Sequence, residues 1–186
     1  MKIELKNISI KELSKDYSDD GEGGVKGYGG KLDIRPPFQR EFVYGDKERN
    51  KVIDTVSKGF PLNVMYWAVR KNGTFEIIDG QQRTISICQF INRTFSYKKK
   101  YFQNLQEDEQ SKILNYELSV YLCTGTDTEK LEWFKTINIA GKELTDQELR
   151  NAVFHGSWVS AAKKWFSKNS CPAYQIGKDY LNGTPN

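Results

Sequence analysis

Residues 75–93 read FEIIDGQQRTISICQFINR, and the periodicity of this stretch changes near its middle. The first four residues are mostly β-branched or aromatic, which favours a buried strand. Asp79-Gly80 then stops the strand, and from Gln82 onward the spacing becomes helical. The expected helix has an apolar face of Ile87, Phe90 and Ile91 and a polar stripe of Gln82, Ser86, Gln89 and Arg93. The sequence therefore predicts a strand that runs through a tight turn directly into a helix.

The predicted turn has the chemistry of an anion site. Asp79 is a good N-cap, and Gln82 three residues later would complete a capping box. Backbone N–H groups and the positive end of a helix bind phosphates in such a geometry. Arg83 in the first helical turn opposes the helix dipole, so it is favourable only beside an anion. The alternative is that Asp79 and Gln82 merely cap the helix, while Arg83 is solvated or pairs with a surface carboxylate.

Two further stretches carry a resemblance to a known family. Residues 34–44 read IRPPFQREFVY, and residues 134–145 read FKTINIAGKELT. Together with Asp79-Gly80-Gln81-Gln82-Arg83, these ordered boxes resemble the ParB/sulfiredoxin-like domain at the N-terminus of GmrSD-type, modification-dependent restriction proteins. The resemblance implies an α+β fold: a mixed sheet with helices in residues 1–100, followed by a helix-rich extension in residues 101–186. We expect the chain to be the N-terminal portion of a longer protein, or else a minimal member of the family.

The resemblance also implies a function, namely binding and hydrolysis of a nucleoside triphosphate with Mg²⁺ in restriction or antiphage defence. Asp79 would hold Mg²⁺, Arg83 would contact the β- or γ-phosphate, and Gln81 or Gln82 would orient the attacking water. The expected catalytic residues are Asp79, Gln82 and Arg83, and the expected nucleotide-binding residues are Gln39, Arg40, Gly80, Gln81, Gln82, Arg83, Thr84 and Asn138. Thr136 stands where many relatives have an arginine, which removes one expected contact. A nuclease domain or subunit, DNA and further copies of the chain are the partners to consider.

Charge favours a phosphate-bearing partner without identifying it. The net charge is +4, but residues 31–100 hold fourteen Lys and Arg against seven Asp and Glu. Such a segment suits a nucleotide or a polyanion. The rival hypothesis is therefore a non-catalytic DNA-binding module that grips the phosphate backbone, with Lys98, Lys99 and Lys100 among its contacts. The other alternative is that the positive charge belongs to a lysine-rich, solvated surface that binds no partner.

Missing residue types exclude several enzyme classes. The single histidine, His155, cannot build an H-N-H nuclease site or an H-E-x-x-H zinc site. The three cysteines, Cys88, Cys123 and Cys171, form no C-x-x-C pair, so neither a zinc site nor a disulfide framework is indicated. Sulfiredoxin-like redox chemistry needs a cysteine where Gln81-Gln82 stand. No apolar run reaches membrane-spanning length, and a cytoplasmic location is expected.

The remaining pattern predicts the elements around the turn. Ser9 and Glu12 form a capping box at a helix start, and residues 18–30 form a glycine-rich loop. A helix over residues 47–58 has Asp46 as N-cap and Gly59 as terminator. The other expected elements are strands at 64–70, 74–78 and 118–123 and helices at 107–114, from 126, from about 147 to 154 and at 157–167.

Overall fold

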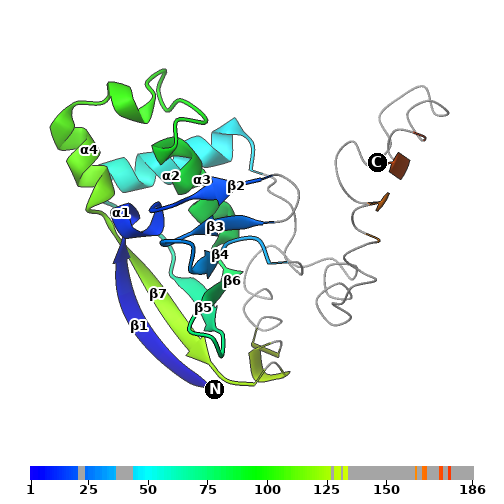
Figure 1. Cartoon of the computed structure of the whole chain (residues 1–186). Coiled ribbons are helices and arrows are strands. Elements are labelled where there is room, and N and C mark those ends of the chain that lie inside the picture. The colour runs from blue at the N-terminus through cyan, green and yellow to red at the C-terminus, as the bar shows by residue number, and fades with distance from the viewer. Residues whose placement is uncertain are drawn as a thin grey trace. The chain divides into compact units, whose positions relative to one another are not determined.

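The computed structural model describes residues 1–20, 24–36, 44–126, 128–130, 132–133, 162, 165–166, 172–173 and 176. The chain divides into two compact units, Met1–Glu143 and Leu144–Asn186. The labelled helices and strands all lie in the first unit (Figure 1). In chain order they are β1 (Lys2–Ser9), α1 (Ile10–Leu13), β2 (Ser18–Asp19), β3 (Val25–Gly27), β4 (Leu32–Asp33), α2 (Asp46–Lys58), β5 (Met65–Val69), β6 (Phe75–Asp79), α3 (Gln81–Ile91), the 3₁₀ turn η1 (Phe102–Asn104), α4 (Glu107–Leu114) and β7 (Glu117–Thr124).

The strands form one seven-stranded mixed sheet in the order β1-β7-β5-β6-β4-β3-β2. β5 is parallel to β7 and β4 is parallel to β6, whereas the other neighbouring pairs are antiparallel. This sheet with its helices confirms the predicted α+β class. Strand β7 lies inside the sheet, between β1 and β5, and it covers the strand expected at residues 118–123. The sheet therefore includes residues beyond position 100.

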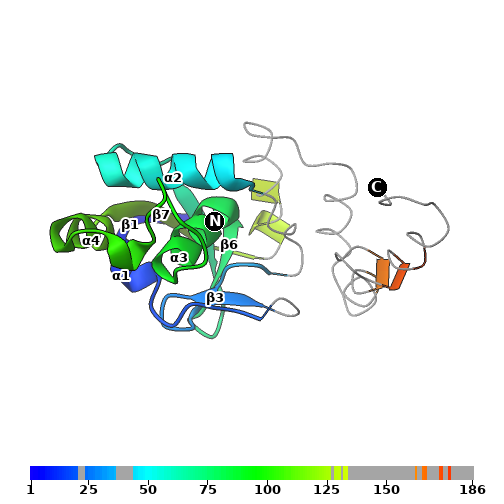
Figure 2. The same cartoon turned by 90° about the horizontal axis from the view of Figure 1, so that it is seen from above.

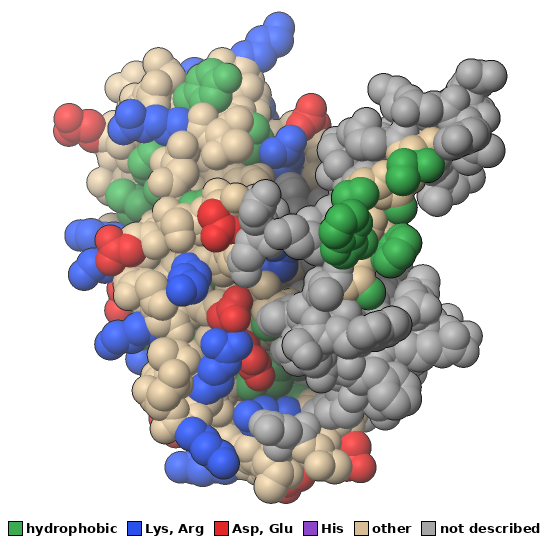
Figure 3. Space-filling view, turned by 45° about the vertical axis from the view of Figure 1, so that its right-hand side comes forward, with side chains coloured by type: hydrophobic (Ala, Val, Ile, Leu, Met, Phe, Trp, Pro, Cys, Tyr) green, Lys and Arg blue, Asp and Glu red, His purple; other side chains and the backbone are tan. Residues whose placement is uncertain are grey.

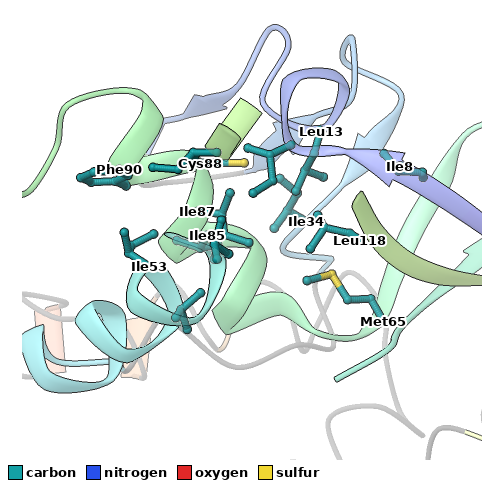
Figure 4. Close-up of a cluster of buried hydrophobic side chains, with 14 of the residues drawn as sticks. Ile8, Leu13, Ile34, Ile53, Met65, Ile85, Ile87, Cys88, Phe90 and Leu118 are labelled. Atoms are coloured by element: carbon teal, nitrogen blue, oxygen red, sulfur yellow. The ribbon is translucent and has the colours of Figure 1, made fainter. Parts of the chain in front are cut away.

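One face of the sheet carries the core. Alternating residues of the strands turn their side chains to this face, as the pleat requires, and meet α2 and α3, which lie side by side in Figures 1 and 2. α3 is buried on most sides, and in Figure 4 its Ile85 and Ile87 lie among residues of the strands and loops. The largest fully buried side chains include Ile8, Leu13, Ile34, Met65, Trp67, Ile77 and Phe90. The β6–α3 connection thus leads directly into the hydrophobic core.

Several predicted element ends are confirmed. Ser9 and Glu12 form a reciprocal capping box at the start of α1. Gly59 ends α2 in the left-handed conformation, with φ of 73°. A further helix begins where expected, because Thr126 Oγ1 accepts a hydrogen bond from the Glu129 N–H at 3.3 Å. Local side-chain and backbone chemistry was enough to place these ends.

Two expectations need correction, namely the N-cap of α2 and the structure of the glycine-rich stretch 18–30. Gly45, not Asp46, is the N-cap of α2, and no side chain caps it. Asp46 is the first helical residue, and it accepts a hydrogen bond from Arg49 Nη2 at 2.6 Å. The glycine-rich stretch 18–30 contains β2 and β3 as well as loop. Gly27 serves close packing there, because a Cβ would lie 2.8 Å from the Leu13 carbonyl oxygen.

Some predictions fall on residues that the structure does not describe. The helices expected at 147–154 and 157–167, His155 and Cys171 all lie outside the described residues. Among the described residues, no helix is both long enough and apolar enough to cross a membrane.

Candidate functional site

The turn between β6 and α3 enters the helix through a glycine. Gly80 has φ of 100° and is the N-cap of α3, and its carbonyl accepts the Thr84 N–H at 2.9 Å. The N-cap glycine supplies no side-chain hydrogen bond, so the predicted capping box between Asp79 and Gln82 is wrong. The physical reason is the left-handed residue between strand and helix, which displaces Asp79 from the capping position. The N-cap itself therefore offers no side-chain acceptor to the first turn of α3.

Gly80 also packs closely against Met65 of β5. A Cβ at this position would lie 2.7 Å from Met65 Cγ, shorter than carbon atoms tolerate. The left-handed φ independently favours glycine. Two separate constraints thus fix one small residue here, and they hold the N-terminus of α3 against the inner strand of the sheet.

Arg83 is anchored on three sides. Its Nη2 donates to Asp79 Oδ2 at 2.9 Å and to the Val64 carbonyl at 3.2 Å, and its Nη1 donates to the Asn63 carbonyl. Its side chain is only 15% exposed, against 37% for Asp79. The structure therefore shows the carboxylate pairing that the sequence left as an alternative, because Asp79 offsets the cation that opposes the helix dipole.

Two glutamines are buried beside this ion pair. Gln81 is 4% exposed and Gln82 is 7% exposed. Gln82 Nε2 donates to Gln81 Oε1 at 3.1 Å, and Gln82 Oε1 accepts the Tyr44 N–H at 3.3 Å. Tyr44 is the last residue of the stretch 34–44, so this hydrogen bond brings the end of that stretch to the turn. Thr84 is fully buried, and its hydroxyl points to Met65 Sδ at 3.4 Å.

The structure gathers half of the predicted site residues at one turn. Asp79, Gly80, Gln81, Gln82, Arg83 and Thr84 all belong to the one turn and the start of α3. The second group, which consists of Lys98, Lys99 and Lys100, follows the C-terminal end of α3. This eleven-residue helix, about 16 Å long, lies between the two groups. Gln39, Arg40 and Asn138 lie outside the described residues.

The three lysines form a tight turn with an unusual backbone. Lys98 and Lys99 have φ of 49° and 64°, in the left-handed region that lysine rarely adopts. Backbone hydrogen bonds between Tyr97 and Lys100, at 2.9 and 3.0 Å, close the turn. Two consecutive left-handed residues there are typical of Asn-Gly hairpins, not of Lys-Lys.

Asp54 of α2 holds this lysine turn in place. Lys98 Nζ lies 3.2 Å from Asp54 Oδ1 and 4.8 Å from the centre of the Tyr97 ring. The Tyr97 hydroxyl and Lys58 Nζ donate to the same carboxylate. These hydrogen bonds, that from Lys58 first, hold the pKa of Asp54 well below its usual range. On the face drawn in Figure 3, Lys and Arg are interspersed with Asp and Glu, so geometry distinguishes this turn better than charge does.

Several of these supporting residues carry no signal in the sequence. Asp54 contacts Lys98 across a separation of more than forty positions, and Met65 contacts Gly80 from another strand. Asn63 and Val64 contribute only backbone carbonyls, which any residue offers. Of these features, only the turn at Gly80 could be expected from the sequence, because Asp-Gly is a common turn dipeptide.

Metal and redox chemistry can be tested against the residues at the turn. Among the described residues, no three His, Cys, Asp or Glu side chains are placed to hold a metal ion together. Asp79 is the carboxylate at the turn, and one carboxylate suits Mg²⁺, which keeps several waters and takes oxygens from a substrate phosphate. Cys88 is fully buried, and burial raises the pKa of its thiol, so it is an inert core residue.

Comparison with known proteins gives one match. A family model for the GmrSD restriction endonuclease, N-terminal domain, matches residues 22–155. The match includes the β6–α3 turn, the lysine turn and both further sequence boxes. No curated protein and no solved structure gives a significant match.

Proposed function

Because the chain belongs to the family of GmrSD restriction endonuclease N-terminal domains, we propose that its β6–α3 turn binds a nucleoside triphosphate. Binding, followed by hydrolysis, would serve a restriction or defence protein that acts on DNA through a nuclease domain or subunit. The observation that carries this proposal is the burial of Gln81 and Gln82 at the start of α3, directly after the N-cap Gly80. Burying an amide is costly unless it is hydrogen-bonded, and the bonds of these glutamines to each other and to Tyr44 hold both amides beside an arginine and a carboxylate.

The first step of this function is an exchange of partners by Arg83. A phosphate that approaches the N-terminus of α3 meets the positive helix end and an N-cap glycine without a competing side chain. It also competes with Asp79 for the Arg83 guanidinium, whose planar fork suits phosphate as well as carboxylate. The bonds from Arg83 to the Asn63 and Val64 carbonyls keep the guanidinium at the turn during this exchange. Phosphate binding would thus free the carboxylate of Asp79.

The freed carboxylate and the glutamine pair would supply the remaining roles. Asp79 would hold Mg²⁺, which supplies positive charge to the phosphate oxygens. Gln81 and Gln82 are linked by their own hydrogen bond and tied to Tyr44. They would present an amide to the attacking water once the phosphates are in place. Gln39, Arg40, Thr84 and Asn138 remain proposed contacts of the nucleotide.

Isothermal calorimetry with Mg²⁺ and each of the four common triphosphates tests the proposal. We expect binding of at least one triphosphate, and we expect Arg83→Ala to lose it. Arg93→Ala is the matched control, because Arg93 is exposed just beyond the opposite end of α3 and should leave affinity unchanged. No heat with any triphosphate up to about millimolar concentration would refute nucleotide binding.

A second candidate function is supported by the lysine turn. Lys98 and Lys99 are held in a costly left-handed conformation, and such strain concentrates at functional positions. Asp54 and Tyr97 fix the first lysine, so Lys99 and Lys100 stand exposed on a rigid base. We propose that this turn contacts the DNA backbone, where ammonium groups neutralise phosphates. The two functions use opposite ends of α3 and can be tested separately.

A further inference from the structure

Strand β1 forms one edge of the sheet and is long for such a position. Its eight residues pair only with β7 among the described residues. The strand is exposed from Lys2 to Asn7, and the apolar side chains of Ile3 and Leu5 are 42% and 56% exposed. It contains no proline, and its register against β7 is unbroken. An edge of this kind is a template for a further strand.

The unused backbone groups of β1 belong to its odd-numbered residues. The Ile10 N–H donates to the Tyr116 carbonyl at 3.0 Å, which makes these two residues a hydrogen-bonded pair. Hydrogen-bonded pairs recur at every second residue of an antiparallel ladder. The even-numbered residues of β1 therefore bond to β7. The N–H and C=O groups of Ile3, Leu5 and Asn7 face the open edge.

The charges of β1 alternate on one face of the strand. Lys2, Glu4 and Lys6 share the face of the buried Ile8, whereas Ile3 and Leu5 share the other. Lys6 is already oriented, because its Nζ donates to the Tyr28 hydroxyl at 3.1 Å. Within the described part of the chain, Glu4 is held only by Lys2, at 3.9 Å, and its side chain is 66% exposed. It can therefore meet a cation on an added strand.

This pattern is complementary to a second copy of itself in one antiparallel register. With Leu5 opposite Leu5 of the other copy, each Glu4 faces a Lys6, and residues 2–8 pair throughout. The register with Glu4 opposite Glu4 brings together like charges at that pair and at Lys2 with Lys6. The register with Lys6 opposite Lys6 also repels at its centre. Opposite charges placed directly across a ladder stabilise it, and like charges destabilise it.

We propose that two copies of the chain associate through antiparallel pairing of their β1 strands around Leu5. The two-fold axis passes between the Leu5 residues, so the same edge serves both copies. The sheet continues from one copy into the other. Two Glu4–Lys6 ion pairs cover one face of the junction, and the Leu5 pair with the flanking Ile3 side chains covers the other.

Analytical ultracentrifugation of the 186-residue chain over a dilution series tests the proposal. We expect a reversible monomer–dimer equilibrium. Glu4→Lys should raise the dimer Kd about tenfold or more, because both ion pairs become repulsive. The double variant Glu4→Lys with Lys6→Glu restores opposite charges in this register and should restore the dimer. Lys2→Glu is the matched control, since position 2 faces Ile8 and the Kd should change little.

Several outcomes would overturn the proposal. A wild-type chain that stays monomeric at the highest concentration refutes it, and so does a Glu4→Lys variant that still dimerises with the original Kd. Failure of the double variant to recover shows that the register is different. Amide hydrogen exchange gives an independent reading in the unmodified protein. Protection at Ile3, Leu5 and Asn7 should rise with concentration, whereas exchange that is independent of concentration contradicts pairing at this edge.

Discussion

Arg83 and Asp79 face each other across the β6–α3 turn, with Nη2 and Oδ2 2.9 Å apart. The pair joins the last residue of the strand to the first turn of the helix. The same guanidinium reaches back to the Asn63 and Val64 carbonyls, ahead of β5. One side chain therefore ties together three segments that meet at the candidate site. A phosphate that reaches the turn meets a guanidinium that already makes these three contacts.

The first prediction concerns Arg83. Arg83→Ala should lower the free energy of unfolding of the ligand-free protein by about 1–3 kcal/mol, because it leaves a carboxylate and two carbonyls without their donor. Asp79→Ala should cost less, about 1 kcal/mol, since Arg83 keeps both carbonyl bonds. Sequence reasoning alone predicts the reverse order, because it treats Asp79 as a helix cap and Arg83 as unopposed. Urea denaturation of both variants measures the order directly.

The same variants separate structure from nucleotide binding. Arg83→Lys keeps the charge but loses the fork, so it should recover part of the stability and little of the nucleotide affinity. If Arg83→Ala is as stable as the parent protein, the anchoring seen at the turn contributes nothing in solution. Thermal unfolding with and without triphosphate completes the comparison, since a bound nucleotide should raise the melting temperature of the parent only.

The second prediction concerns Gly80. Gly80→Ala should destabilise the protein by more than about 2 kcal/mol, because left-handed strain and a Cβ contact of 2.7 Å with Met65 act together. Gly73→Ala is the control for strain alone. Gly73 has φ of 76°, and an added Cβ there would meet nothing within 4 Å, so the change should cost only about 1 kcal/mol. Denaturant unfolding gives both values.

A double-mutant cycle resolves the two contributions at Gly80. Adding Met65→Ala to Gly80→Ala removes the side chain that the new Cβ would meet. The pair should then be less destabilising than the sum of the single changes. Strict additivity would mean that the contact with Met65 does not limit the choice of residue at this turn.

The third prediction is a pH effect at Asp54. Three hydrogen bonds, from Lys58 first and then from Tyr97 and Lys98, depress the pKa of this carboxyl. A depressed pKa stabilises the folded form above the carboxyl's unfolded value of 3.8, and this contribution is lost as the pH falls toward the folded pKa. Carbon-13 NMR should therefore find Asp54 still ionised at pH 3.8. A titration midpoint of Asp54 at or above pH 3.8 would contradict the anchoring of the lysine turn by this carboxylate.

The fourth prediction concerns the lysine turn and DNA. Replacing Lys98, Lys99 and Lys100 by alanine should weaken binding to duplex DNA and reduce the slope of log K against log salt by about 2–3. Asp54→Asn should weaken binding less, because it frees the turn without removing its cations. The control is a variant in which the exposed Lys11 and Lys15, in and just after α1, are replaced by alanine, because it also removes lysine charges. An unchanged salt slope in the triple variant would exclude the turn from the DNA interface.

Elements whose ends depend on neighbouring residues could be predicted from the sequence. The capping box of Ser9 and Glu12, the left-handed Gly59 and the helix of residues 107–114 all follow from local chemistry, and all are present. The strand-to-helix transition at Asp79-Gly80 was also correctly located. What failed at this turn was the assignment of the cap, because a left-handed residue moves the helix start by one position.

Features made by distant residues could not be predicted. The position of β7 inside the sheet depends on pairing with β1 and β5, and no local pattern specifies which strands will be neighbours. The anchoring of Arg83 by carbonyls before β5 and of Lys98 by Asp54 likewise needs the fold to be known. Local sequence therefore located the candidate turn, whereas its supports became visible only in three dimensions.

The inner position of β7 has a consequence for how the chain is made. During translation, β1 and β5 leave the ribosome well before the strand that lies between them. Lys2, at the start of β1, finds its partner only when Thr124 has been synthesised. The sheet cannot close progressively behind the growing chain, because β1 has no partner strand until β7 has been synthesised. A nascent chain halted before β7 would present β1 without a partner strand and β5 with one open edge.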